Sequence, residues 1–167
     1  MIIINKRNLF FLISVWLLST LLSAQNVTIS TPQTQLLLSV PNGGTPEQLY
    51  YGSRTSDADI RSICETARRR NAYPVYGMGY PCETALSVRH ADGNLTLQMA
   101  VIGVKETRLT KENATLTVIE LKDKVYPFFV NICYKAWQDA DVIETWTEIR
   151  HEEKKPVQLQ QFASAYL

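Results

Sequence analysis

The sequence predicts an all-β fold, an antiparallel β-sandwich with one short helix. Segments rich in β-branched and aromatic residues recur at intervals of roughly 8–12 residues, separated by clusters of Gly, Pro, Asn and Asp. In residues 142–150 the side chains alternate: Ile143 and Ile149 face one side, and Glu144 and Glu148 the other. Only one stretch of the mature chain has helical periodicity, so a strand-based fold is favoured.

The first 24 residues are predicted to be a secretory signal peptide. Lys6 and Arg7 precede the apolar run Leu9–Leu22, and small residues stand before a cut expected after Ala24. The run is short for crossing about 30 Å of hydrocarbon, which favours a cleaved signal over the alternative, a membrane anchor. We therefore expect a secreted or periplasmic protein whose single domain is residues 25–167.

The strands are predicted in chain order from local composition and from the turns between them. The turn clusters are Pro41–Gly44, Ala91–Asn94 and Gln138–Asp141. An Asp-Gly pair between two apolar runs is typical of a hairpin, so residues 85–90 and 95–104 are expected to pair. The predicted strands are residues 27–30, 36–40, 49–52, 85–90, 95–104, 114–121, 125–135, 142–150 and 156–167.

One helix is predicted from Ser56 to Arg70. Apolar residues fall at the i, i+3, i+4 and i+7 spacing of a one-sided helix, namely Ile60, Ile63, Cys64 and Ala67. Ser56 or Asp57 can cap its start, and the three arginines that close the segment suit the negative end of the helix dipole. They are interpreted as a solvated helix end, with a phosphate or partner contact as the alternative.

The segment Asn71–Glu83 is predicted to be a rigid irregular loop, because it is dense in Tyr, Pro and Gly. Its tyrosines, Tyr73, Tyr76 and Tyr80, offer large contact areas with polar tips. Two interpretations stay open: the loop contacts a neighbouring domain or a ligand, or it plugs one end of the sandwich formed by the chain itself.

Composition excludes several classes of function. Without Lys6 and Arg7, 15 basic residues face 16 acidic ones, so the surface lacks the basic stripe of a nucleic-acid-binding protein. A catalytic (β/α)₈ barrel needs about 250 residues and does not fit.

No metal site or nucleophile is predicted, and no cofactor is expected. His90 and His151 lie in no metal-ligand spacing and each adjoins a polar turn, so both are predicted to be exposed and idle. The three cysteines, Cys64, Cys82 and Cys133, are interpreted as small buried hydrophobic residues, with a Cys64–Cys82 disulfide as the alternative.

The carboxylates offer no catalytic pair. Glu144 and Glu148 share a strand face about 13 Å apart, farther than either glycosidase geometry requires. Trp146 stands between them, and an aromatic face flanked by acceptors can stack on a sugar ring. The alternative is that Trp146 packs under the 71–83 loop or against another domain.

Several motifs together resemble the amino-terminal domain of family 36 glycoside hydrolases, the α-galactosidases. Residues 70–79 (RNAYPVYGMG) are similar to its EYP-x-YG-x-G passage, and residues 83–93 (ETALSVRHADG) to its EPALEVRHADG passage. Residues 141–149 (DVIETWTEI), 155–159 (KPVQL) and 162–167 (FASAYL) continue the resemblance to the last residue.

The resemblance implies a β-supersandwich that precedes a catalytic (β/α)₈ barrel hydrolysing terminal α-galactosides with retention. No catalytic residue of that barrel has a counterpart in this chain. We therefore expect an inactive, non-catalytic fragment that covers the barrel of the same or a split protein and supports contacts between copies. The alternatives are a free-standing module that binds galactoside-containing sugars, and a protein-interaction sandwich. Candidate ligand or barrel contacts are Trp146, Glu144, Glu148, Tyr73, Tyr76 and Tyr80.

Overall fold

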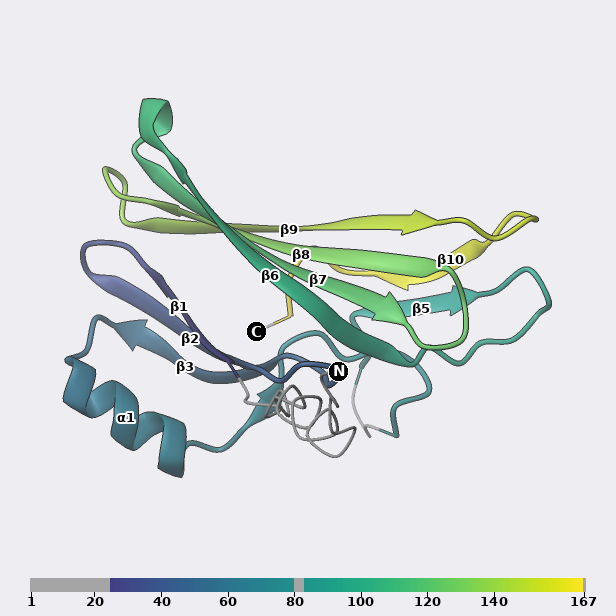
Figure 1. The fold of residues 1–167 in the computed structure, drawn as a ribbon, viewed down its shortest axis with the longest axis horizontal. Helices are drawn as coiled ribbons and strands as arrows, with labels where there is room; N and C mark the ends of the chain where they lie inside the picture. Colours follow the sequence, from purple (N-terminus) through teal and green to yellow (C-terminus); the bar gives the residue numbers. More distant parts are fainter. Residues whose placement is uncertain (1–24, 80–82, 167) are drawn as a thin grey trace, which may run out of the picture.

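A computed structural model describes residues 25–79 and 83–166 of the chain. These residues form two antiparallel layers that face each other (Figure 1). One layer is the four-stranded sheet β6-β7-β8-β9, and the opposite layer contains the sheet β1-β2-β3-β4. A two-stranded sheet, β10-β5, lies at the end away from helix α1. The predicted sandwich is confirmed; the predicted signal peptide lies outside the described residues.

The strands of the first half of the chain are β1 (Gln25–Ser30), β2 (Thr34–Val40), β3 (Glu47–Ser53), β4 (Arg70–Asn71) and β5 (Leu86–Arg89). Those of the second half are β6 (Met99–Leu109), β7 (Ala114–Asp123), β8 (Phe128–Trp137), β9 (Val142–His151) and β10 (Gln158–Phe162). Helix α1 (Asp57–Thr66) and the short 3₁₀ helix η2 (Thr110–Glu112) complete the fold. No helix in the described part of the chain has the length and hydrophobicity of a transmembrane span.

One hydrophobic core lies between the layers and draws on both of them. Leu38 and Leu86 from one side, and Ile119 and Phe128 from the other, are fully buried in it. Burying a side chain of this size stabilises a fold by about 1.5–3 kcal/mol. The chain then returns to this core, because Ala163 and Tyr166 pack against it.

Helix α1 is shorter than predicted. The side chain of Ser56 caps it as expected, accepting a hydrogen bond from the Asp59 N–H at 3.2 Å. The backbone becomes extended at Ala67, so the three following arginines lie beyond the helix and no basic residue occupies its last turn. The apolar side of the helix is only half-covered, and none of its residues is buried.

The predicted hairpin of residues 85–90 and 95–104 is wrong. Its turn forms, since the His90 N–H donates to the Asn94 carbonyl at 2.8 Å, but β5 pairs with β10 and β6 pairs with β7. The Leu97 N–H instead donates to the Tyr76 carbonyl at 3.0 Å. The chain therefore crosses from one sheet to the other after the turn.

Several strand limits also differ from prediction, and two of the differences have a clear cause or consequence. The buried carboxylate of Asp123 accepts the N–H groups of Val125 and Tyr126 at 2.7 and 2.8 Å, which holds these residues in a turn and delays β8 until Phe128. The last strand ends at Phe162 rather than continuing to the end of the chain, although the Ala163 N–H still donates to the Ala85 carbonyl at 2.8 Å.

The carboxylate of Asp141 joins the two layers. It lies in the β8–β9 turn and accepts hydrogen bonds from the hydroxyl of Thr31, from the Gln33 N–H at 3.0 Å and from the Thr34 N–H at 3.2 Å. These donors lie in the turn between β1 and β2 and at the first residue of β2, in the opposite layer. The same hydrogen bonds, that of Thr31 foremost, hold the pKa of Asp141 below its usual range.

Asp141→Asn is expected to lower the Tm at pH 7 by a few degrees, because an amide accepts these hydrogen bonds less strongly. Asn tolerates the positive φ of 52° at this position, so the substitution tests the charge rather than the backbone. A lowered folded pKa stabilises the fold above the unfolded value of 3.8 and loses that effect as the pH falls through the folded pKa. Thermal melts should therefore show the two proteins converging as the pH falls below 3.8 and through the folded pKa of Asp141.

Candidate functional site

The prediction that His90 is exposed is wrong, whereas His151 is exposed as expected. His90 follows β5, and its imidazole is fully buried. Its Nδ1 lies 2.7 Å from the carboxylate of Glu153, which also accepts the Ala91 N–H at 2.9 Å. Because a carboxylate can only accept, Nδ1 carries the proton of this hydrogen bond.

Aromatic side chains enclose the imidazole of His90. The ring of Tyr126 stacks on it with a centroid separation of 3.7 Å, and Phe128 meets it edge-on at 5.8 Å. The pair of His90 and Glu153 thus joins two segments that are far apart in the sequence, the turn after β5 and the turn after β9.

A second hydrogen-bonded pair consists of Asp92 and Tyr126, whose ring stacks on His90. The hydroxyl of Tyr126 donates to Asp92 at 2.7 Å and accepts from the Asn94 amide at 3.0 Å. The backbone N–H of Asn94, followed by the Tyr126 hydroxyl, lowers the pKa of Asp92, and the bond to Asp92 raises the pKa of Tyr126. Asp92 therefore stays ionised and Tyr126 neutral over the physiological range.

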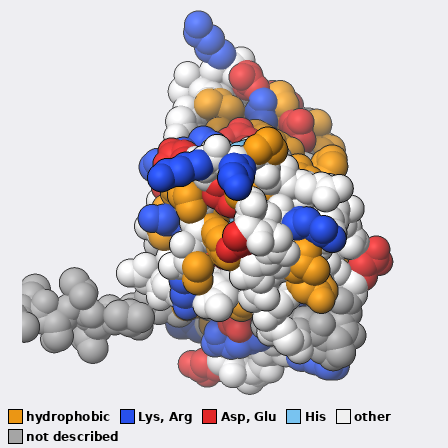
Figure 2. Space-filling view, turned by 90° about the vertical axis from the view of Figure 1, so that its right-hand side faces the viewer, with side chains coloured by type: hydrophobic (Ala, Val, Ile, Leu, Met, Phe, Trp, Pro, Cys, Tyr) orange, Lys and Arg blue, Asp and Glu red, His pale blue; other side chains and the backbone are white. Residues whose placement is uncertain are grey.

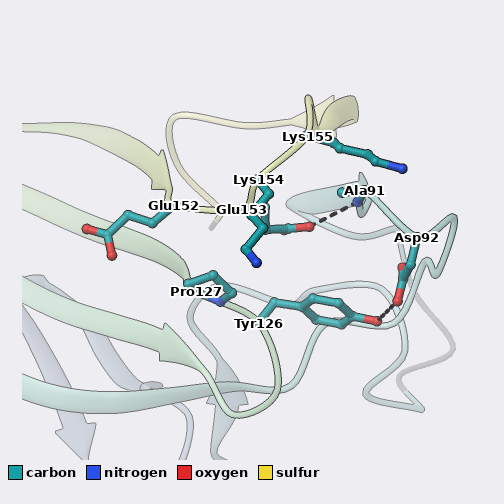
Figure 3. A pocket seen from close by; sticks show the side chains of 8 residues that line it. All are labelled: Ala91, Asp92, Tyr126, Pro127, Glu152, Glu153, Lys154 and Lys155. Carbon is teal, nitrogen blue, oxygen red and sulfur yellow. Dashed lines mark hydrogen bonds between the residues drawn. The ribbon is translucent and has the colours of Figure 1, made fainter.

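These groups line a hollow of about 440 Å³ at this end of the molecule (Figure 3). Figure 2 shows this end, where basic, acidic and hydrophobic side chains are interspersed. In Figure 3 the Tyr126 ring points toward Asp92, while Glu152 points away from both. The hollow is lined by Ala91, Asp92, Tyr126, Pro127, Glu152, Glu153, Lys154 and Lys155.

The arrangement around His90 supports architecture rather than catalysis. Asp92 and Glu153 already accept hydrogen bonds from neighbouring turns, and Tyr126 is held between two partners. A general acid needs a raised carboxyl pKa, and that of Asp92 is lowered. In the described part of the chain, no group of three or more His, Cys, Asp and Glu side chains could hold a metal ion.

The structure pairs Trp146 with Glu148 but gives Glu144 a different partner. All three face outward on β9, but Glu144 accepts from the indole of Trp137 at 3.1 Å. Glu148 accepts from the indole of Trp146 at 3.3 Å and from the Asn131 amide at 3.1 Å. Trp146 is half-buried on this open sheet face.

Trp146 lies directly opposite Cys133 in the β8–β9 ladder, and the Cys133 side chain, on the same outward face, is buried. Burial raises the pKa of the Cys133 thiol to about 11, with a smaller effect of Glu148. Of the described cysteines, Cys133 is buried as predicted and Cys64 is half-buried; both are free, while Cys82 lies outside the described residues.

Trp146→Ala is expected to expose the Cys133 thiol. The test uses a background with Cys64→Ser and Cys82→Ser, so that Cys133 is the cysteine that reacts. At pH 8 a thiol reagent should label this parent slowly and the Trp146→Ala variant at least about tenfold faster. The reason is that the thiol must ionise and the reagent must reach it. Trp137→Ala, on the same face but opposite Val142, is the matched control and should leave the rate unchanged.

The tyrosines of the predicted loop separate into different environments. Tyr73 is 3% exposed within the core, and its hydroxyl donates to the Ala163 carbonyl at 3.1 Å, whereas Tyr76 is 47% exposed. Tyr80 lies outside the described residues. Gly77 has a φ of 96°, and a Cβ there would come within 2.6 Å of Thr96, so the bend of the loop requires glycine. Residues 72–75 thus plug the core, while Tyr76 faces outward.

Sequence reasoning missed His90 and Glu153 because they pair across 63 residues. The one local signal was that His90 ends an apolar strand just before a tight turn, a position where a side chain can still be buried. Glu153 lies in a charged segment that has the composition of solvated surface.

Comparisons with known proteins extend these observations. Residues 44–167 match the family model described as the glycosyl hydrolase family 36 N-terminal domain. A search of curated protein sequences found no match. Among solved structures, the α-galactosidase from Lactobacillus brevis has 15% identity and a TM-score of 0.73, covering 85% of this chain and 23% of that one.

Two α-galactosidases from Geobacillus stearothermophilus give similar values. An AgaA variant in complex with 1-deoxygalactonojirimycin has 15% identity and a TM-score of 0.74, over 84% of this chain and 24% of that one. AgaB has 13% identity and a TM-score of 0.71, over 85% and 23%. The chain thus spans about a quarter of the length of these structures, and at such identities the likeness shows a shared fold.

Proposed function

Because the chain belongs to the N-terminal domain family of the family 36 glycosyl hydrolases, we propose that it serves as the non-catalytic β-sandwich of an α-galactosidase acting on terminal α-galactosides. The observation that carries this proposal is the family match over residues 44–167, supported by the fold shared with three α-galactosidases. In this role the chain covers a catalytic barrel of the same or a split protein and supports contacts between copies. In this proposal the catalytic residues belong to that barrel.

The geometry of the described residues agrees with a supporting role. The carboxylates at the β5 end hold turns together, and those on β9 accept indole N–H groups. Tyr76 is the exposed tyrosine of the described 71–79 segment and offers an aromatic contact for a neighbouring domain.

Enzyme assays of the purified chain test this proposal. The chain should release no nitrophenol from 4-nitrophenyl α-galactoside above buffer, while the L. brevis enzyme serves as the active control. It should also show no binding of raffinose below about 10 mM by calorimetry. Turnover, or raffinose binding that Trp146→Ala weakens, would contradict the proposal and favour an enzyme or a sugar-binding module.

We further propose that the protein is exported, with residues 1–24 removed as a signal peptide. The support is the order of basic residues, apolar run and small residues in the sequence. Expression of the full chain in a Gram-negative host should place it in the periplasm with Gln25 as its first residue, as N-terminal sequencing would show. An intact Met1 on a cytoplasmic protein would refute export.

A further inference from the structure

A groove between α1 and β3 has no role in the function proposed above. It has a volume of about 510 Å³, within the range of small-ligand sites. The helix covers β3 only lightly, since its apolar side is half-exposed and none of its residues is buried. The lining residues are Gln48, Leu49, Tyr50, Tyr51, Ile63, Thr66, Ala67, Arg68 and Arg70.

The charge of this groove is unbalanced. Arg68 and Arg70 are both exposed, and within the described part of the chain neither forms an ion pair or a side-chain hydrogen bond. Their neighbour Arg69 is different, because it pairs with Glu47 at 3.0 Å. No acidic residue lines the groove among the described residues, so two guanidinium groups remain to bind an anion.

One aromatic ring accompanies these guanidinium groups. Tyr50 and Tyr51 are consecutive on β3, so their side chains lie on opposite faces of the strand, and Tyr51 shares the core-facing side with its ladder partner Leu36. The Tyr50 ring is half-buried on the other face, and its hydroxyl donates to the Ser53 carbonyl at 2.8 Å. The planar face of a tyrosine packs against the apolar face of a sugar ring, and a guanidinium group binds a carboxylate through two parallel hydrogen bonds. Leu49 and Ile63 supply an apolar floor.

We propose that this groove binds a saccharide that carries carboxylates, such as a segment of uronic acid residues. Tyr50 would stack on a sugar ring, while Arg68 and Arg70 bind the carboxylates. The proposal concerns the isolated chain and does not depend on a catalytic barrel.

Calorimetry on the purified chain tests it with trigalacturonate, and with neutral galactotriose of the same length. Trigalacturonate should bind with a Kd of about 1 mM or tighter, and galactotriose at least about tenfold more weakly. Arg68→Gln and Arg70→Gln should each weaken trigalacturonate binding about tenfold, since a charge-assisted pair is lost. Arg61→Gln is the matched control, because Arg61 is an exposed arginine on α1 that does not line the groove.

Each other result overturns the proposal. Equal binding of the neutral trisaccharide would show that charge is not recognised, and absence of trigalacturonate binding would show that the groove is no saccharide site. Loss of binding by Arg61→Gln to the same extent would indicate a diffuse charge effect. Tighter binding of a triglutamate peptide would indicate an acidic protein partner instead. Thermal melts of all variants confirm folding.

Discussion

Tyr73→Ala is expected to lower the free energy of unfolding by about 4 kcal/mol, the largest effect of any substitution in the 71–79 segment. The Tyr73 ring is 3% exposed inside the core, so its removal leaves a cavity among well-packed neighbours. The substitution also removes the hydroxyl that donates to the Ala163 carbonyl at 3.1 Å, which ties the last described residues to the loop. Urea denaturation followed by tryptophan fluorescence measures the loss.

Two further variants separate the contribution of the Tyr73 ring from that of its hydroxyl, and the contribution of a buried tyrosine from that of an exposed one. Tyr73→Phe keeps the ring, and the Ala163 carbonyl still accepts from the hydroxyl of Thr147 at 3.1 Å, so a loss of only about 1 kcal/mol is expected. Tyr76→Ala removes a ring that is 47% exposed and should cost less than about 1 kcal/mol. Equal losses for Tyr76→Ala and Tyr73→Ala would contradict the division of the loop into a buried plug and an outward contact.

Tyr73→Phe also carries a pH dependence. Burial raises the pKa of Tyr73, and a smaller opposing effect comes from its hydrogen bond with Thr147. A raised folded pKa leaves stability unaffected below the unfolded value of 10.0, and stability falls as the pH rises through the folded pKa, because only the unfolded chain ionises readily. The Tyr73→Phe variant should therefore lose less stability than the parent between pH 10 and 12.

Most elements of the fold were predictable because the sequence patterns that specify them lie within a few adjacent residues. Alternation in residues 142–150, the turn clusters and the helical spacing near Ile60 each follow from a few adjacent residues, and each corresponds to an observed element. The strand pairing of residues 85–104 was not local. An Asp-Gly turn does form there, but Leu97 finds a hydrogen bond with Tyr76, and β5 pairs with a strand about 70 residues away.

The site around His90 illustrates the same limit for side chains. Composition marks His90 and Glu153 as polar residues beside turns, and polar turn residues are mostly exposed. Their burial arises only when the turns after β5 and β9 meet and Tyr126 closes over the imidazole. In contrast, the direction of Glu144 and Glu148 on β9 followed from strand alternation, while their indole partners depended on the fold.

Glu153→Ala is the second large effect, with an expected loss of about 3 kcal/mol in the free energy of unfolding. The Glu153 carboxylate accepts from His90 Nδ1 at 2.7 Å and from the Ala91 N–H at 2.9 Å, and its side chain is 6% exposed. Without it, two donors in a buried environment lose their acceptor, and each unsatisfied donor costs about 1–3 kcal/mol. Bulk water cannot replace the hydrogen bond to the imidazole, because the His90 side chain is fully buried.

Two neighbouring changes test whether the pair with His90 carries this effect. Glu152→Ala removes the adjacent carboxylate, which is paired with Arg150 on the surface, and should cost less than about 1 kcal/mol. Glu153→Gln keeps one acceptor oxygen and should lie between the two. His90→Phe should lose less than Glu153→Ala, because it replaces the buried donor with an apolar ring that can still stack on Tyr126, leaving Glu153 to accept from Ala91. Equal losses for the Glu152 and Glu153 alanine variants would show that the turn is held by general charge rather than by its buried acceptor.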